Sequence, residues 1–167
     1  MAKKLTFIDL FAGAGGLSEG FIRAGYEPIA HVEMDEAACY TLKTRTAYYY
    51  LKNTNQYNIY TDYLKGKIGR DELYSHVPSE LMDSVINLPI GGDNNPVIHK
   101  RIEKLLKGRK VDLIIGGPPC QAYSLVGRAR HKDGMKGDRR NYLYVQYAKY
   151  LEKYQPKLFV FENVLHS

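Results

Sequence analysis

The sequence predicts an α/β protein with a doubly wound, mainly parallel sheet. Apolar runs typical of buried strands alternate with segments of helical spacing, and glycine-rich turns follow two of these runs. At 167 residues, with 44% hydrophobic and 25% charged residues, the chain has the size of one domain with a sizeable core. Ligands of such sheets bind beyond the carboxyl ends of the strands, so we expect each candidate site just after a strand.

The first predicted unit is a strand, a turn, a helix and a second strand. Residues 5–11 form a continuous apolar run with one acid, and glycines follow it at positions 13, 15 and 16. Residues 17–24 have helical spacing, and residues 28–32 form a second apolar run. Asp35 is then expected to cap the next helix.

Residues 45–90 carry a weaker signal. Neither a helical nor a strand period is sustained, and glycines and prolines interrupt the segment, so we predict an irregular insertion. Seven of the fifteen tyrosines lie between positions 40 and 63. This pattern is compatible with base stacking, with packing in a partly buried excursion, or with a subunit contact.

Regular spacing returns after this segment. Residues 98–106 are spaced as an amphipathic helix, residues 111–115 as a buried strand, residues 143–154 as a helix and residues 158–161 as a strand. Residues 125–140 combine glycines with basic residues, which is the composition of a mobile loop. The strand–helix alternation therefore continues to the end of the sequence.

Charge is distributed unevenly along the chain, whose net charge is +6. Residues 1–40 carry three basic against six acidic residues, whereas residues 99–110 carry six against one and residues 128–140 six against two. Basic segments favour phosphate-bearing partners, although solvated helix faces have the same composition. The sequence contains no apolar run of about 18 residues and no secretory signal, and two lone cysteines suit a reducing compartment. We expect a cytoplasmic protein, associated with the nucleoid if bacterial, and no membrane partner.

The first candidate site is the turn formed by Phe11, Ala12 and the residues through Gly16. Its glycines let a ligand approach the backbone, and Glu33, twenty residues past Gly13, could accept the hydroxyls of a ribose. A serine replaces the third glycine of the dinucleotide motif, and no basic residue in the turn could bind a pyrophosphate. Adenosine without phosphates suits the turn better, with Met34 against the base. A purely structural turn is the alternative.

The second candidate is the thiol of Cys120, which follows two prolines at the end of a predicted strand. The prolines favour a rigid loop, and polar and basic neighbours would lower the thiol pKa, as a nucleophile requires. These neighbours are Gln121, Ser124, Arg128 and Arg130. A buried, inert thiol is the alternative, and it is the one we assign to Cys39.

The third candidate is Glu162 with Asn163, directly after the last predicted strand. The carboxyl should face the same sheet edge as Cys120. At the mouth of a low-dielectric pocket, a carboxyl has a raised pKa and can hold a proton near neutrality. A helix cap would explain the same glutamate.

Taken in order, Phe-Ala-Gly-Ala-Gly-Gly, Pro-Pro-Cys-Gln and Glu-Asn-Val resemble the DNA (cytosine-5)-methyltransferase family, over the whole chain apart from residues 45–90. The resemblance implies an incomplete Rossmann-like methyltransferase fold with S-adenosyl-L-methionine as cofactor. It implies cofactor contacts from Phe11, Gly13, Ala14, Gly15, Gly16, Glu33, Met34, Asp93, Asn94, Pro119 and Leu143.

The resemblance also implies a reaction. The Cys120 thiolate would add to C6 of cytosine while Glu162 engages N3, so that C5 can accept the methyl group, with Asn163 holding the loop in place. Because C5 is inaccessible in a stacked duplex, the base must flip out of double-stranded DNA. The DNA contacts expected come from Gln121, Ser124, Arg128, Arg130 and Arg140, with Lys132 and Arg139 on the same loop.

Members of this family continue well beyond the Glu-Asn-Val segment, with a target-recognition domain and a segment that completes the cofactor pocket. We therefore expect residues 1–167 to be the N-terminal part of the catalytic domain, either a fragment or one part of a split enzyme. It would be nearly inactive alone, with double-stranded DNA and the missing part as partners. RNA cytosine methylation, a non-catalytic DNA- or nucleotide-binding module and a nicotinamide-dependent dehydrogenase are alternatives. Cys120, Glu162 and Arg140 together argue against the module, and the absent third glycine argues against the dehydrogenase.

Overall fold

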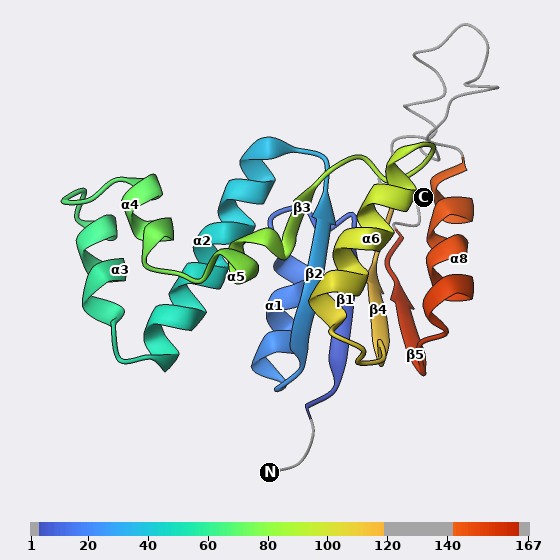
Figure 1. Ribbon diagram of the computed structural model, residues 1–167, viewed down its shortest axis with the longest axis horizontal. Coiled ribbons are helices and arrows are strands. Elements are labelled where there is room, and N and C mark those ends of the chain that lie inside the picture. The colour runs from blue at the N-terminus through green and yellow to red at the C-terminus, as the bar shows by residue number, and fades with distance from the viewer. Residues whose placement is uncertain (1–3, 119–141, 164–167) are drawn as a thin grey trace, which may run out of the picture.

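The computed structural model of the protein describes residues 4–118 and 142–163. A five-stranded sheet in the order β3-β2-β1-β4-β5 lies between two layers of helices (Figure 1). Its strands are β1 (Thr6–Leu10), β2 (Glu27–Glu33), β3 (Val85–Asn87), β4 (Leu113–Gly116) and β5 (Leu158–Phe161). The four pairings are parallel, so the carboxyl ends of the strands share one edge. The predicted doubly wound α/β class is confirmed.

Helices cover the two faces of the sheet (Figure 1). One face carries α1 (Gly16–Arg23) and α2 (Glu36–Asn53), and the other carries α6 (Asn94–Leu106) and α8 (Leu143–Tyr154). Successive side chains of a strand point to opposite faces. Phe7 of β1 therefore packs against Phe21 of α1, with ring centroids 5.9 Å apart, while Ile8 joins the core beneath α6 and α8.

Two buried tyrosines anchor α8 to the rest of the domain. The Tyr147 hydroxyl lies 3.1 Å from the carbonyl oxygens of Ile114 and Val160, to which it donates, and so bridges β4 and β5. The Tyr150 hydroxyl donates to Asn95 Oδ1 of α6 at 3.2 Å. Burial raises the pKa of both phenols, so both remain protonated donors.

Residues 45–90 are largely helical, so the prediction of an irregular segment was wrong. After α2 the chain forms α3 (Tyr57–Leu64), α4 (Arg70–Ser75) and α5 (Ser79–Asp83) before it enters β3. These helices and the end of α2 make a small helical unit beside the sheet, packed around Ala47, Leu51, Leu73 and Val77 (Figure 1). With eight, six and five residues, α3 to α5 are too short to display a clear hydrophobic period.

The other predicted elements are confirmed within a few residues. The first helical segment forms α1, and the two later ones form α6 and α8. Asp35 caps α2 as expected, because its Oδ1 accepts a hydrogen bond from the backbone N–H of Ala38 at 2.7 Å.

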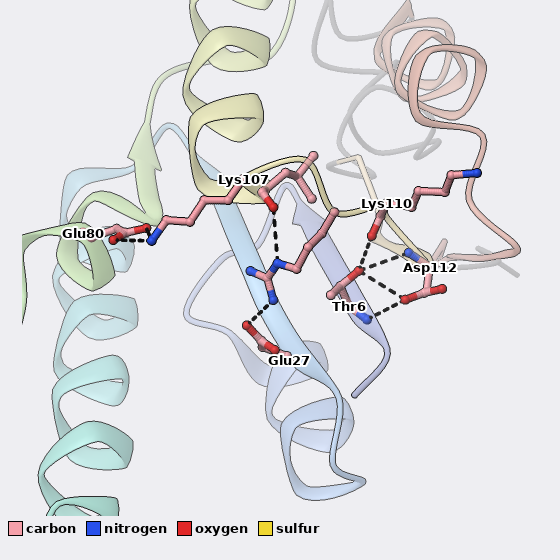
Figure 2. A network of polar contacts seen from close by, with 8 residues as sticks. Thr6, Glu27, Glu80, Lys107, Lys110 and Asp112 are labelled. Carbon is pink, nitrogen blue, oxygen red and sulfur yellow. Dashed lines mark hydrogen bonds and ion pairs between the residues drawn. The ribbon is translucent and has the colours of Figure 1, made fainter. Parts of the chain in front are cut away.

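Polar contacts close the amino-terminal edge of the sheet (Figure 2). The backbone N–H of Thr6 donates to Asp112 Oδ2 at 3.0 Å, and the Thr6 hydroxyl donates to the carbonyl oxygen of Lys110 at 2.7 Å. In the same region Arg109 Nη1 donates to Glu27 Oε1 at 2.7 Å. At this edge Thr6 and Asp112 are hydrogen-bonded to each other, and Arg109 and Glu27 form an ion pair.

Candidate functional site

At the opposite edge, the turn after β1 is tied to the end of β2 by one carboxylate. Glu33 Oε2 accepts a hydrogen bond from the backbone N–H of Gly13 at 2.7 Å. Glu33 Oε1 accepts from the N–H groups of Met34 and Asp35, each at 2.8 Å. A carboxylate has about four acceptor positions, so roughly one remains for a ligand hydroxyl, on Oε2. Glu33 therefore shapes the turn and can still accept a further hydrogen bond.

A cavity of about 560 Å³ opens beside this turn. It is lined by Asp9, Phe11, Ala12, Gly13, Gly16, Leu17, Gly116, Gly117 and Glu162. A Cβ atom placed on Gly13 or Gly16 would meet no atom within 4 Å, so the backbone there faces open space. Gly15 is different, because its Cβ would lie 2.7 Å from Leu42 Cδ2. Its φ of +81° also favours glycine at this position.

The ends of β4 and β5 lie side by side at this cavity. Gly116 is in register with Phe161, and its carbonyl oxygen accepts a hydrogen bond from the N–H of Glu162 at 3.0 Å. A Cβ at Gly116 would lie 1.8 Å from the Leu10 carbonyl oxygen, and one at Gly117 would lie 2.1 Å from that of Glu162. Only glycine allows this close approach of three backbones. Gly117 therefore lies against the backbone of Glu162, and Cys120 follows Gly117 by three positions in the sequence. Cys120 itself lies outside the described residues.

Asp9 begins the glycine-rich motif but was not among the site residues expected from the sequence. Its side chain is 1% exposed, accepts a hydrogen bond from Ser18 Oγ and lines the cavity. Burial raises the pKa of Asp9 to about 7, and the charges of Glu33 and Glu162 act in the same direction, against the opposing effect of Ser18. Asp9 therefore changes protonation near neutral pH. The signal in the sequence is an acid within a buried apolar run.

Other residues expected at the cofactor, Glu33 among them, lie at the same edge but are not among the residues that line this cavity. Met34 is 68% exposed, and Ala14 is also exposed. Asp93 precedes α6 without a side-chain capping bond, and Asn94 Nδ2 donates to the Pro89 carbonyl oxygen at 3.1 Å. Leu143 is half-buried at the start of α8.

Several expected residues lie outside the described part of the chain. They are Pro119, Cys120, Gln121, Ser124, Arg128, Arg130, Lys132, Arg139 and Arg140. Asn163 is described and is exposed beside an apolar hollow of about 390 Å³ between α8 and β5. Cys39 is buried, in agreement with a packing role, and burial raises the pKa of its thiol.

No helix in residues 4–118 and 142–163 is long and apolar enough to cross a bilayer. No group of three or more histidine, cysteine, aspartate or glutamate side chains is placed to bind a metal ion in that part of the chain.

The parallel sheet, the glycine turn after β1 and the carboxylate ending β2 define a Rossmann-like methyltransferase domain. Sequence comparison then identifies the particular family. The chain belongs to the C-5 cytosine-specific DNA methylases, whose family model matches residues 5–73 and 91–166. The unmatched residues between these ranges lie at the end of the predicted insertion.

Individual relatives agree with this family. The chain is 40% identical over 180 residues to the type II methyltransferase M.Bpa9945I of Bacillus paralicheniformis, covering 96% of this chain and 40% of that protein. It is 32% identical over 160 residues to the type II methyltransferase M1.HphI of Haemophilus parahaemolyticus, and the match covers 96% of this chain and 32% of that protein. A crystal structure of an E. coli prophage protein, assigned as a DNA modification methyltransferase, matches with a TM-score of 0.55 and 26% identity, covering 96% and 32%. The chain thus spans less than half the length of each.

Proposed function

We propose that this chain supplies the cofactor pocket and the nucleophile of an enzyme that methylates C5 of cytosine in double-stranded DNA, within a restriction–modification system. One observation carries the proposal. Gly13, Gly16 and Glu162 surround a single cavity at the carboxyl edge, and the chain leaves that cavity at Gly117 toward Cys120.

The cavity suits S-adenosyl-L-methionine. Its volume of about 560 Å³ lies within the usual range of ligand pockets, and Glu33 retains an acceptor for a ribose hydroxyl. Asp9 and Glu162 line the cavity, and among the described residues no basic side chain does so. Such a lining favours a cationic sulfonium over a pyrophosphate. When bound, the cofactor supplies the methyl group as an electrophile.

The proposed reaction uses groups from two strand ends. The Cys120 thiolate would form a bond to C6 of the flipped cytosine while Glu162 holds a proton at N3, so that C5 would become an enamine carbon able to accept the methyl group that a bound cofactor would supply. A base from solvent would then take the C5 proton, the C6–S bonding electrons would return to sulfur as the thiolate, and the N3 proton would return to Glu162, which restores the ring and both residues. Asn163 is proposed to hold the position of Glu162.

The proposed DNA contacts come from the segment that follows Cys120. They are Gln121, Ser124, Arg128, Arg130 and Arg140. Cationic side chains there would bind phosphates while the target base leaves the stack.

The second proposed partner is the part of the enzyme that this chain does not span, on the same or a separate chain. β5 forms an edge of the sheet, and its residues Leu158, Phe159, Val160 and Phe161 are 65%, 58%, 37% and 37% exposed. An apolar edge strand with this exposure is a surface that other polypeptide normally covers. We propose that the remaining part of the enzyme packs against β5.

Covalent trapping tests this function. The chain is co-expressed with the region of M.Bpa9945I that it does not match, then mixed with cofactor and a duplex containing 5-fluorocytosine. Because the fluorine cannot leave C5 as a proton does, we expect an adduct that survives denaturing electrophoresis. Cys120→Ser should abolish it, and Glu162→Gln should slow its formation strongly.

Two results would contradict parts of the proposal. DNA binding without any adduct would favour a non-catalytic module. Sustained transfer of radiolabelled methyl groups by the purified chain alone would show that no further part of the enzyme is needed.

A further inference from the structure

A second cavity, of about 720 Å³, lies away from the carboxyl-edge site. It follows one side of α2 from Tyr40 to Lys52, with walls from α1, α3 and α4, and shares no lining residue with the 560 Å³ cavity. At about 1.5 Å per helical residue, these two ends are roughly 18 Å apart. We call this cavity the α2 groove.

The α2 groove carries an excess of positive charge. Four of its lining residues are basic and one is acidic. Glu19 pairs with both Arg23 and Arg45, at 2.7 Å and 3.0 Å.

Lys52 lies near the end of α2, and Arg70 of α4 lies beside Tyr40, near the start of α2. Neither forms an ion pair with any residue in the described part of the chain. Lys52 Nζ donates a hydrogen bond to the Tyr48 hydroxyl at 3.2 Å, which leaves its charge without a carboxylate partner. The charges of both cations are thus left for an anionic ligand.

Aromatic rings lie between these cations. The Tyr48 ring packs edge-on against those of Tyr49 and Tyr60, with centroids 5.1 Å and 5.2 Å away. The Arg70 guanidinium lies 3.4 Å above the centre of the Tyr40 ring, forming a further flat surface. Tyr40, Tyr48 and Tyr49 lie outside the apolar core of the helical unit. Packing of that core therefore does not account for these three rings.

We propose that the α2 groove binds a single-stranded segment of nucleic acid, with phosphates near Lys52 and Arg70 and bases against the tyrosines. Interleaved cations and aromatic rings are the two requirements of such sites. A span of roughly 18 Å between the two cations is too long for one nucleotide to contact both, which favours a strand over a mononucleotide. Bases must be unpaired to expose their faces to the rings. The site requires neither Cys120 nor the carboxyl-edge cavity, so it goes beyond the proposed function.

Fluorescence anisotropy of the full chain with a labelled twelve-nucleotide single strand tests the proposal. Replacing both cations (Lys52→Ala with Arg70→Ala) should weaken binding at least tenfold. The slope of log K against log salt should flatten by about 1.4, since each single-strand phosphate contact contributes about 0.7. Tyr48→Ala should weaken binding about fivefold or more, whereas Tyr48→Phe should retain the affinity.

A matched control removes the same charge elsewhere. Lys100 and Lys104 are exposed on α6, outside the groove. If Lys100→Ala with Lys104→Ala lowers the affinity as much as the groove pair does, the binding is general charge attraction and the proposal is overturned.

Comparing different nucleic acids in the same binding measurement distinguishes the remaining outcomes. DNA and RNA strands of one sequence identify the physiological source, and either supports the site. Tighter binding of a duplex, with no effect of Tyr48→Ala, would overturn base stacking. Competition by a free mononucleotide at the same phosphate concentration would overturn a strand in favour of a small ligand.

A second measurement covers variants that do not fold. The unmodified chain is irradiated with a strand containing 5-iodouracil, and the crosslinked peptide is mapped. Crosslinks at Tyr48 or Tyr60 support the groove, and crosslinks confined to other segments contradict it. Cys120→Ser should leave this pattern unchanged, so failure of the groove and failure of the proposed catalysis are distinguishable.

Discussion

The carboxylates at the two edges of the sheet differ in whether they form ion pairs. At the amino edge Asp112 receives the N–H of Thr6 and pairs with Lys157 at 2.7 Å. At the carboxyl edge Asp9, Glu33 and Glu162 form no ion pair with any residue of the described segments. At the amino edge an ion pair therefore supports the fold, whereas Glu33 and Asp9 at the carboxyl edge are held by hydrogen bonds from backbone and Ser18 donors. The proposed ligand site and the ion pair thus lie at opposite ends of the strands.

Substitution of glycine should have the largest and most unequal effect on the two edges. Gly116→Ala would place a Cβ 1.8 Å from a carbonyl oxygen at a φ of +131°, so we expect a loss of more than ~4 kcal/mol in the free energy of unfolding. Gly108 precedes β4 at the amino edge with a φ of +78° and no atom near its Cβ position. Gly108→Ala should cost only about 1 kcal/mol. Urea denaturation measures the free energy of unfolding of both variants. Equal losses for Gly116→Ala and Gly108→Ala would contradict the expected difference between the two edges.

Asp9 should make stability depend on pH. Its pKa is about 7 in the folded chain against 3.8 for an unperturbed aspartate, so the folded state binds the extra proton between these values. The contribution of Asp9 to the free energy of unfolding is therefore complete below pH 3.8 and is lost as pH rises toward 7. By linkage the loss is roughly 2–4 kcal/mol. Asp9→Asn should remove this dependence and stabilise the chain at about pH 8, as thermal unfolding at several pH values would show.

His31 should change stability with pH in the direction opposite to Asp9, and this serves as a control. It is fully buried, and burial lowers its pKa from 6.5 to about 4. The contribution of neutral His31 is present above pH 6.5 and is lost as pH falls toward 4. Asp9→Asn should therefore leave a chain that weakens on acidification through this range. Identical pH profiles for Asp9→Asn and the unmodified chain would contradict the raised pKa of Asp9.

Glu33→Gln should have the next largest effect. The amide keeps one acceptor oxygen for three backbone donors, so we expect a loss of about 1–3 kcal/mol in stability. Because Glu33 is also proposed to accept a ribose hydroxyl, cofactor affinity should fall at least tenfold in equilibrium dialysis with labelled S-adenosylmethionine.

Glu27→Gln is the matched variant at the amino edge. Glu27 is half-exposed in its pair with Arg109, so its loss should be under about 1 kcal/mol, with cofactor binding unchanged. A comparable drop in cofactor binding for both variants would show that Glu33 acts only through general stability.

The smallest effect is expected for Lys157→Ala. The lysine side chain is 74% exposed in its pair with Asp112, so its removal should cost less than about 1 kcal/mol. The difference from the unmodified chain should shrink further in about 1 M salt, where such a pair is screened. A salt-independent loss of several kcal/mol would contradict this assignment.

Local pattern was sufficient for much of the fold and for part of the site. The apolar run of β1, the cap at Asp35 and the spacing from Gly13 to Glu33 are short-range features, and the structure contains each of them. The helices α3 to α5 are too brief to display a period, and three-residue β3 too brief to stand out. The pKa of Asp9 depends on burial and on Glu162, which only the folded chain brings near it.

The exposure of β5 has a practical consequence for work with this chain alone. An uncovered apolar strand can pair with the same strand of another copy, so solubility should decline as concentration rises. A preparation that has aggregated in this way would lack activity whatever the state of its thiol. Sedimentation at several concentrations should therefore precede any measurement of catalysis.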